Sequence, residues 1–500
     1  MKLKSIYSIT AGTLFSLGFA PFDLWFLTII SLSLYLYLLK DVNKKQSLVI
    51  GFFYGVGIWI IGISWVYVSI HYHGNIHIIN SLLLTILLVL CLSIYVSLHA
   101  LVYSFFRTHK VIDALLVFPS SWLGLEIIRE SAFTGFPWLI AGTALGGSFL
   151  DGWIPIIGAT GTTIFLLMLS GCLYLLFLKW KEGTSLFLPL FLLVIISLSG
   201  YVTKSINWTN QEDEILISIY QPNLTLQEKW SFIGIKKTKI LFEKALDSSD
   251  FKELIVFPET ALILNENDQI GWLEGLSKIA KNKKVGLITG LIERTNNPGS
   301  TETSIKNRIK GFGEAEGSYD KIKLVPFGEF IPFRKYIGKI LDILNLKLTN
   351  TSPGSTISHI RSGNAIISPS ICYEVAFSNF IRKSAIGSNI LLTISNDTWF
   401  GSSIGPYQHL EIAQNRAIEH QKALIRSTNS GISSIIDKKG KILVKQGFFE
   451  KKSIKSKVFL NKGTTLFARI GYLPIYVYLL LSFIIISYIN RTKVRKFLKI

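Results

Sequence analysis

The chain has 500 residues, more than one ordinary domain needs, and 49% of them are hydrophobic, with a mean hydropathy of +0.42. These values argue against a single soluble domain. The three cysteines, Cys91, Cys172 and Cys372, argue against a disulfide framework because two of them lie inside apolar segments. The net charge of +20 would suit nucleic-acid binding, but the basic residues follow a membrane-topology pattern, so we expect no nucleic-acid partner.

Apolar residues gather in the first 203 positions and again near the end of the chain. A helix needs about 20 apolar residues to cross a bilayer core. We predict about eight spans, at residues 5–20, 23–39, 47–70, 77–106, 111–128, 153–178, 185–203 and 470–490. The first resembles a cleaved signal peptide, but Pro21 follows the small residues at its end and disfavours cleavage, so we interpret it as a retained span.

The basic residues predict which side of the membrane each loop faces. With a cytoplasmic N-terminus, the inner loops hold Lys2, Lys4, Lys40, Lys44, Lys45, Arg107, Lys110, Lys179, Lys181, Arg491, Lys493, Arg495, Lys496 and Lys499. The short outer segments hold only Arg129. Because positive charge stays on the cytoplasmic side, both termini are predicted to be cytoplasmic. The predicted organisation is a transmembrane domain at 1–203, an extracytoplasmic domain at 204–465, and a last span with a basic tail at 466–500.

Residues 204–465 alternate short apolar segments with amphipathic ones. We predict strands at 215–221, 254–257, 285–291, 365–371, 390–395, 423–427 and 432–436, and helices at 229–246, 269–281, 376–386 and 407–420. Strands that alternate with helices predict a layered α/β fold. Candidate catalytic residues follow the ends of these strands, where such folds usually carry their chemistry.

Three of these residues offer a carboxylate, an ammonium group and a thiol. Glu259 is either a partly buried base or a carboxylate at a helix N-terminus. Lys321 is not distinguished from Lys323 by charge alone. Cys372 is either a core thiol or a nucleophile, and the turn that follows its strand favours the nucleophile. A base, an oxyanion stabiliser and a nucleophile suffice for acyl transfer through a thioester.

Other positions have a functional and a simpler interpretation. Glu329 is placed to support the base or the lysine. Trp230 and Trp399 either line a slot for an acyl chain or belong to the core. His409 and His420 lack a third partner, and no phosphate-binding or dinucleotide motif is present. We therefore expect neither a metal nor a cofactor.

Taken together, the motifs resemble those of the apolipoprotein N-acyltransferase family, within the nitrilase (carbon–nitrogen hydrolase) superfamily. In the block after residue 203 they are Phe257-Pro258-Glu259, Lys321 with the segment 324–332, Cys372-Tyr373-Glu374, and the segment 395–401. In the membrane part they are the segments 19–23, 63–67 and 133–139. The resemblance runs nearly end to end. One departure is Ser304-Ile305-Lys306-Asn307, where some relatives carry a motif rich in Tyr and Asn.

The resemblance implies an α-β-β-α sandwich with a Glu–Lys–Cys triad. Glu259 would be the general base, Lys321 would stabilise the tetrahedral intermediate, and Cys372 would carry the acyl chain. Glu329 would support the triad, and the residues near the substrate channel would be Trp230, Tyr373, Glu374 and Trp399.

The reaction that the resemblance implies moves an acyl chain from a phospholipid, usually phosphatidylethanolamine, to the α-amine of a diacylglyceryl-cysteine. The acceptor is an apolipoprotein, and the step is the last in lipoprotein maturation. The implied location is the bacterial inner membrane, with the catalytic domain in the periplasm.

Two other functions fit part of the pattern. A membrane-tethered, nitrilase-type amidase would use the same triad on a small carbon–nitrogen substrate, but such a substrate does not require eight spans. A transporter with an outer binding module would need charges in mid-membrane, whereas Asp113 and Glu126 lie toward the ends of their spans.

Overall fold

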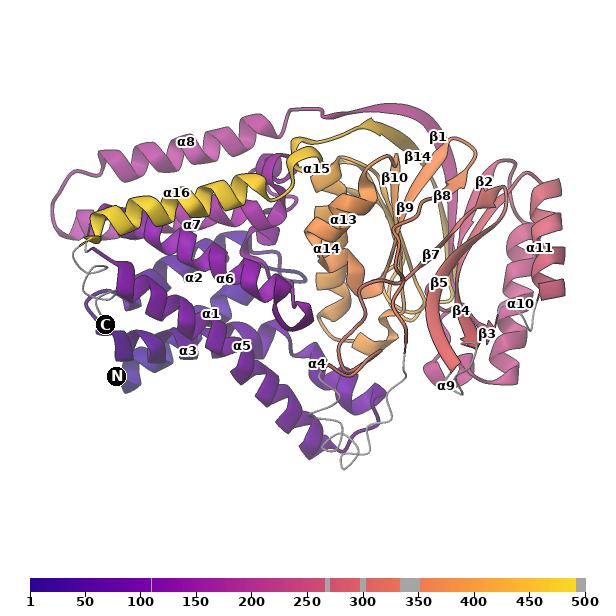
Figure 1. Ribbon diagram of the computed structural model, residues 1–500, viewed down its shortest axis with the longest axis horizontal. Coiled ribbons are helices and arrows are strands. Elements are labelled where there is room, and N and C mark those ends of the chain that lie inside the picture. Colours follow the sequence, from indigo (N-terminus) through magenta and orange to yellow (C-terminus); the bar gives the residue numbers. More distant parts are fainter. Residues whose placement is uncertain (109, 266–269, 297–302, 333–350, 492–500) are drawn as a thin grey trace. The chain divides into compact units, whose positions relative to one another are not determined.

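The computed structural model describes residues 1–108, 110–265, 270–296, 303–332 and 351–491 (Figure 1). The chain divides into two compact units. The helical unit comprises Met1–Ile206, Phe400–Glu411 and Arg469–Ile500, and the sheet unit comprises Asn207–Trp399 and Ile412–Ala468. The segment Phe400–Glu411, which lies within the block predicted at 204–465, therefore packs with the helical unit.

Eight helices of the helical unit coincide with the predicted apolar segments. They are α1 (Lys2–Ser16), α2 (Trp25–Leu38), α3 (Lys44–Gly62), α5 (Ile78–Phe106), α6 (Phe118–Ser131), α7 (Ile154–Lys181), α8 (Phe187–Thr203) and α16 (Leu473–Ile489). Within the described residues, three stretches are long and apolar enough to cross a membrane, namely Lys44–Gly62, Ile78–Phe106 and Asp151–Lys181. The number of spans and the side that each loop faces stay predictions.

Two predicted spans are not continuous α-helices. The segment predicted at 47–70 ends as α3 at Gly62 and continues as a short helix, α4 (Trp65–Val68), and a π-helical turn, Ser69–His73. The segment predicted at 111–128 begins with a π-helical turn, Asp113–Val117, before α6. Both interruptions lie near the ends of the predicted spans.

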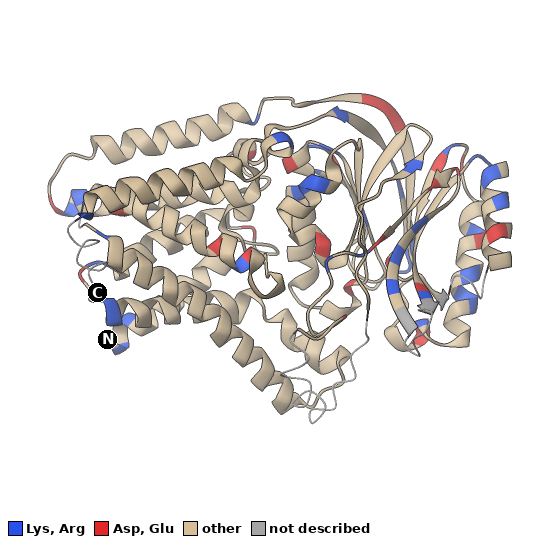
Figure 2. Ribbon diagram, in the orientation of Figure 1, with Lys and Arg blue, Asp and Glu red and all other residues tan. Residues whose placement is uncertain are grey.

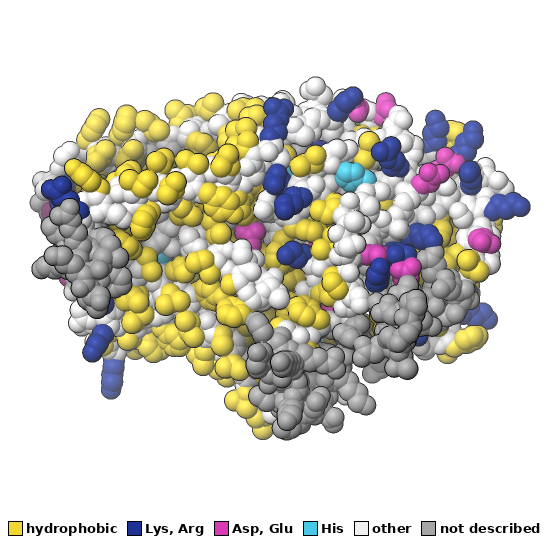
Figure 3. All heavy atoms as spheres, viewed as in Figure 1, with side chains coloured by type: hydrophobic (Ala, Val, Ile, Leu, Met, Phe, Trp, Pro, Cys, Tyr) yellow, Lys and Arg dark blue, Asp and Glu magenta, His cyan; other side chains and the backbone are white. Residues whose placement is uncertain are grey.

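The outer surface of the helical unit is mostly apolar. Few charged residues lie along its helices (Figure 2), and hydrophobic side chains cover much of the face in view (Figure 3). Leu83 and Phe187, for example, leave 60% and 72% of their surface exposed. An apolar patch of this extent on a folded protein indicates contact with a membrane or a partner.

Glycine permits a close contact between two helices of this unit. A Cβ on Gly12 of α1 would lie 2.1 Å from the carbonyl oxygen of Tyr54, and a Cβ on Gly57 of α3 would lie 2.1 Å from that of Ile9. The two helices therefore pack backbone against backbone. Small residues at such crossings are typical of helices that associate without a hydrophobic driving force, as in lipid.

The sheet unit contains two sheets, which Figure 1 shows as neighbouring layers. In the first, the order is β14-β1-β2-β4-β5-β7, with β3 beside β4; in the second, it is β13-β12-β11-β10-β9-β8-β6. The strands of the first sheet are β1 (Thr209–Gln221), β2 (Glu253–Val256), β3 (Leu262–Asn265), β4 (Gly286–Asn296), β5 (Thr303–Gly313), β7 (Ser318–Asp320) and β14 (Lys452–Gly463). Those of the second are β6 (Ala315–Glu316), β8 (Ile360–Ser362), β9 (Ala365–Ile371), β10 (Ile390–Ser395), β11 (Leu424–Thr428), β12 (Ser434–Ile436) and β13 (Ile442–Lys445).

Alternation along the strands builds the layers of this unit. On β2, Leu254 and Val256 enter the core between the two sheets, while Ile255 packs against a helical layer on the other face. That layer consists of α10 (Phe232–Asp247) and α11 (Ile270–Asn282). On the second sheet, α13 (Ser378–Ala385) and the C-terminal part of α14 (Gly405–His420) form the outer layer (Figure 1). The arrangement confirms the predicted nitrilase-like α-β-β-α sandwich.

The seven predicted strands are present within a few residues, but several strands were not predicted. The predicted helix 229–246 is in fact α9 (Leu226–Lys229) followed by α10, with a break at Trp230 and Ser231. Among the missed strands, β5 and β14 are long and rich in charged residues; on β5, Lys306, Arg308 and Lys310 stand at every second position. Antiparallel strands of this kind bury one face only, so they lack the continuous apolar run that revealed the others.

Candidate active site

The three candidate catalytic residues come from separate strands of both sheets. Glu259 follows β2, Lys321 directly follows β7, and Cys372 directly follows β9. The interactions described below bring all three side chains together in the sheet unit. Their convergence across two sheets is what a shared site requires and what a chance distribution of polar residues would not produce.

The carboxylate of Glu259 is buried and held from three directions. Asn307 Nδ2 on β5 donates to Glu259 Oε1 at 2.6 Å, and Lys321 Nζ lies 3.4 Å from the same oxygen. The main-chain N–H of Asn396, just after β10, donates to Oε2 at 2.7 Å. The carboxylate is therefore fixed in place, as a general base must be before it can accept a proton from a defined direction.

Lys321 lies between two carboxylates. Its Nζ atom is 2.8 Å from Glu329 Oε1 and 3.4 Å from Glu259 Oε1, and its side chain is almost fully buried. Burial by itself lowers the pKa of this lysine, but the carboxylates of Glu329 and Glu259 outweigh burial and hold that pKa well above its ordinary value. Lys321 is thus a permanent cation at the centre of the cluster, suited to stabilise negative charge that develops nearby.

The structure separates Lys321 from its neighbour Lys323, which charge alone left equivalent. Lys323 Nζ lies over the ring of Phe377, 5.2 Å from its centroid. Glu329 is held in turn by the main-chain N–H of Val325, which donates to its Oε2 at 2.7 Å. Glu329 therefore links Lys321 to the loop that follows it, as expected of a supporting residue.

Cys372 begins a 3-10 turn, Cys372–Ala376, in a left-handed conformation with φ +52°. A residue with a Cβ adopts this conformation at a cost, and such strain is common where a side chain must be presented to a site. Burial raises the pKa of the Cys372 thiol to about 12; the Glu259 carboxylate adds to the rise, while Lys321 and a hydrogen bond with Ser395 oppose it. The resting group is therefore the neutral thiol, which needs a base in order to react.

Glu374 connects the strand of the cysteine to the loop of the lysine. Its Oε1 accepts from Tyr319 Oη at 2.8 Å and from the main-chain N–H groups of Ile322 and Lys323 at 2.7 and 2.9 Å. Its Oε2 accepts from the Ile371 N–H at 2.7 Å. The side chain is fully buried, and burial raises its pKa to about 7 against the effect of these hydrogen bonds. Glu374 thus lies in the interior, between the strand of the cysteine and the loop of the lysine, and does not face open space.

The aromatic residues expected near a substrate channel lie at the surface of the sheet unit or partly beneath it. Trp230, between α9 and α10, is 56% exposed, and Trp399 is 43% exposed. Tyr373 is half-buried and packs edge-on against Phe377, with ring centroids 5.1 Å apart. Both indole rings therefore expose part of their apolar surface.

Two residues that hold Glu259 were missed as site residues. Asn307 stands in the segment 304–307, which differs from some relatives, yet its side chain contacts Glu259 directly. Asn396 acts through its main-chain N–H, which no side-chain pattern reveals. The polar residues that follow the apolar strand β10 were the available signal. Among the described residues, no group of His, Cys, Asp and Glu could hold a metal ion.

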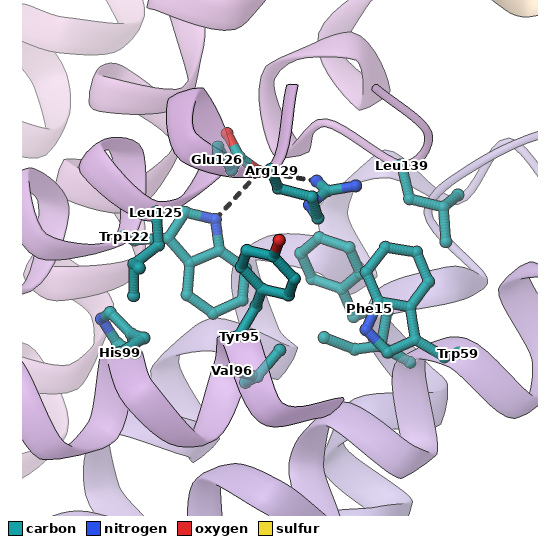
Figure 4. Close-up of a pocket in the computed structure, with 11 residues that line it drawn as sticks. Phe15, Trp59, Tyr95, Val96, His99, Trp122, Leu125, Glu126, Arg129 and Leu139 are labelled. Atoms are coloured by element: carbon teal, nitrogen blue, oxygen red, sulfur yellow. Dashed lines mark hydrogen bonds and ion pairs between the residues drawn. The ribbon is translucent and has the colours of Figure 1, made fainter. Parts of the chain in front are cut away.

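A buried carboxylate of the helical unit, that of Glu126, lines a small pocket (Figure 4). Glu126 Oε1 accepts from Trp122 Nε1 at 3.0 Å and from the Ala141 N–H at 2.9 Å, and its Oε2 accepts from Thr163 Oγ1 at 2.9 Å. Arg129, whose guanidinium group lies over the ring of Trp59, is 3.9 Å from Glu126. The pocket holds about 30 Å³, which is room for one water molecule.

The charges near this pocket hold a loop in place. Arg129 Nη1 donates to the carbonyl oxygens of Phe136 and Trp138 at 2.9 and 2.5 Å. Trp138 Nε1 in turn donates to Gln408 Oε1 at 2.7 Å, within the same unit. These contacts give Arg129 and the segment 133–139 a structural role. The buried charges are therefore explained without a transport path.

Comparison with known proteins first defines the class of the sheet unit. Residues 216–464 match the family model "Carbon-nitrogen hydrolase", and residues 11–173 match "Apolipoprotein N-acyltransferase N-terminal domain". Saccharomyces cerevisiae Nit3, described as a member of branch 10 of the nitrilase superfamily, is 19% identical, with a TM-score of 0.37, over 50% of this chain and 92% of that chain. The family match at residues 216–464 identifies the sheet unit as a carbon–nitrogen hydrolase domain.

Two curated relatives extend the match to almost the whole chain. Apolipoprotein N-acyltransferase of Photobacterium profundum is 32% identical over 96% of this chain and 93% of its own length. The protein of the same name from Vibrio parahaemolyticus is 31% identical over 96% of each. The chain belongs to the apolipoprotein N-acyltransferase family.

Proposed function

We propose that the protein is a phospholipid-dependent apolipoprotein N-acyltransferase that works through an acyl thioester on Cys372. The observation that carries the proposal is the contact of Lys321 with both Glu259 and Glu329, next to a strained and half-buried Cys372. A base, a fixed cation and a thiol in one buried cluster are the groups that acyl transfer requires. The names of the relatives supply the acceptor, an apolipoprotein.

In the first half-reaction Glu259 takes the proton of the Cys372 thiol as sulfur attacks the ester carbonyl of a phospholipid. The oxyanion that forms is stabilised by Lys321. Its collapse breaks the ester C–O bond, and the lysophospholipid alkoxide leaves with the proton from Glu259. The thioester that remains keeps enough group-transfer potential to acylate an amine.

In the second half-reaction the α-amine of a diacylglyceryl-cysteine attacks the thioester. Glu259 accepts a proton from the amine, the C–S bond breaks, and the Cys372 thiolate is reprotonated. The two lipid substrates use one site in turn, so the kinetics are ping-pong. We place the site at the extracytoplasmic face of a bacterial inner membrane, with residues 1–203 and 466–500 as its anchor, and phosphatidylethanolamine as the donor.

Intact-mass spectrometry tests the proposal directly. Purified protein incubated with phosphatidylethanolamine should gain the mass of one acyl chain, in a form that hydroxylamine removes, and a diacylated lipopeptide should discharge it. Cys372→Ala should gain no acyl mass, which corresponds to a loss of at least about 1,000-fold in the acylation rate. Cys172→Ala, a matched change at a buried cysteine of the helical unit, should acylate as the wild type does. A folded wild-type protein that forms no adduct would refute the phospholipid donor.

A further inference from the structure

A second buried lysine contacts Glu259 from the side of its main chain. Lys229, the last residue of α9, is 4% exposed. Its Nζ atom donates to the main-chain carbonyl oxygen of Glu259 at 3.0 Å and to Thr260 Oγ1 at 2.8 Å. We propose that Lys229 is a positioning residue for the general base, which fixes the backbone of Glu259 and adds a second positive charge beside its carboxylate. The inference rests on the function proposed above.

The segment that Lys229 contacts is held tightly on its other side by β4. The Phe257 N–H donates to the Ile288 carbonyl at 2.9 Å, and the Gly290 N–H donates to the Pro258 carbonyl at 3.2 Å. A Cβ on Gly290 would lie 2.5 Å from the nitrogen of Thr260, so β4 approaches this segment as closely as a backbone can. Lys229 adds two side-chain hydrogen bonds to these main-chain contacts.

The backbone conformation of Thr260 explains why this contact is needed. Its φ of +46° is left-handed, which is unusual for a β-branched residue. Such a conformation persists only where the surroundings hold it. The hydrogen bond from Lys229 to the Thr260 hydroxyl is part of that support, and it fixes the direction in which the preceding residue, Glu259, projects its side chain.

The positive charge of Lys229 also points to a role at the site, because hydrogen bonding alone does not explain it. Both hydrogen-bond partners given above are neutral oxygens, and burial of an ammonium group beside neutral oxygens costs free energy that an apolar side chain of the same length avoids. Burial lowers the pKa of Lys229 to about 8, while the charge of Glu259 acts in the opposite direction. The cation of Lys229 therefore adds a second positive charge to the cluster around Glu259.

The helical turn that carries Lys229 is rigid. Thr225 and Glu228 form a capping box at its start, and the Ser231 N–H donates to the Glu228 carbonyl at 3.0 Å just after its end. The same turn presents the exposed Trp230 to the outside. Lys229 and Trp230 are consecutive, so the turn that contacts the main chain of Glu259 also carries an exposed indole ring.

The test compares Lys229→Met with Lys229→Gln, which keeps a hydrogen-bond donor but has no charge. The control is Lys236→Met, the same change at an exposed lysine of α10. The readout is the burst of p-nitrophenolate from p-nitrophenyl butyrate, recorded against pH, because this activated ester needs the triad but no phospholipid. Melting in detergent establishes that each variant is folded.

We expect the burst rate of Lys229→Met to fall about 100-fold, because the base is misplaced. We expect Lys229→Gln to retain more of the rate. In both variants the acid limb of the profile should move to higher pH, because the cluster loses a buried positive charge. The other charged groups near the cluster, Lys321, Glu329 and Asp397, are unchanged in both variants.

Each outcome decides a different point. If Lys229→Met acylates within about threefold of the wild type, the role of Lys229 is refuted while the proposed function stands. If Lys229→Met does not fold, Lys229→Gln decides, and an unshifted acid limb in that variant refutes the role of the charge. If the wild type gives no burst at any pH, the triad itself is refuted, and the role of Lys229 falls with it.

Discussion

Each unit of the molecule buries a carboxylate next to a cation, and the two clusters differ in what they leave available. In the helical unit, Glu126 accepts from two side chains and a main-chain N–H, and Arg129 binds two carbonyl oxygens of one loop. In the sheet unit, Glu259 and Lys321 lie beside a thiol whose pKa is raised to about 12, chiefly by burial. A buried ion pair therefore indicates a catalytic site only where a reactive group, such as a thiol, lies beside it.

The comparison predicts that the sheet cluster is needed for chemistry, and Lys321→Met is the change with the largest expected effect. We expect the acylation rate to fall by about 100- to 1,000-fold, since the variant removes the cation that stabilises the oxyanion. Single-turnover mass spectrometry of the acyl-enzyme measures this rate. Lys321→Arg should not restore it, because a planar guanidinium group does not fit a site built around a compact ammonium group.

Lys323→Met is the matched control for this variant. Its ammonium group lies over Phe377 and takes no part in the cluster, so the rate should stay within about threefold of the wild type. A large loss in Lys323→Met together with a small one in Lys321→Met would reverse the assignment of the two lysines.

The helical cluster should be needed for stability instead. Glu126→Ala leaves the Trp122, Ala141 and Thr163 donors without their acceptor, at a cost of about 3 kcal/mol in the free energy of unfolding. Glu126→Gln keeps one carbonyl oxygen and should lose less. Thermal melting in detergent measures the stability, and the acylation rate of the folded protein should be unchanged. A variant that melts like the wild type but does not acylate would give the helical cluster a part in the chemistry.

The helices and strands that consist of continuous apolar runs could be predicted from the sequence. The eight apolar helices and the buried strands β9 and β10 fall where hydrophobic runs indicated them. The long strands β5 and β14 were missed because polar and charged residues interrupt their apolar residues. β14 pairs with β1, where Thr209 lies opposite Gly463, so its pairing depends on residues far away in the chain. Local periodicity does not contain that information.

The same limit applies to the site. Glu259 and Cys372 stand out because each follows an apolar strand, and Lys321 because it precedes the apolar segment 324–327. The resemblance to a family joined them into one hypothesis. Lys229 did not stand out, because its contact with Glu259 is to a main-chain oxygen and brings together residues 30 positions apart. Main-chain contacts of this kind have no signature in the residues that form them, so only coordinates reveal them.

The smallest expected effect concerns the exposed tryptophans, because each unit has one and the two can be compared directly. Trp399→Ala should leave thioester formation largely intact but raise hydrolysis relative to transfer by about three- to tenfold, because water gains access to the thioester. Trp180→Ala, at a residue of the helical unit that is 72% exposed, is the matched control and should not change the ratio. The ratio is measured by following the acylated protein with and without a diacylated lipopeptide. If Trp399→Ala and Trp180→Ala give the same ratio, Trp399 does not shield the thioester from water. Its exposed ring then either contacts substrate or has no part in the reaction.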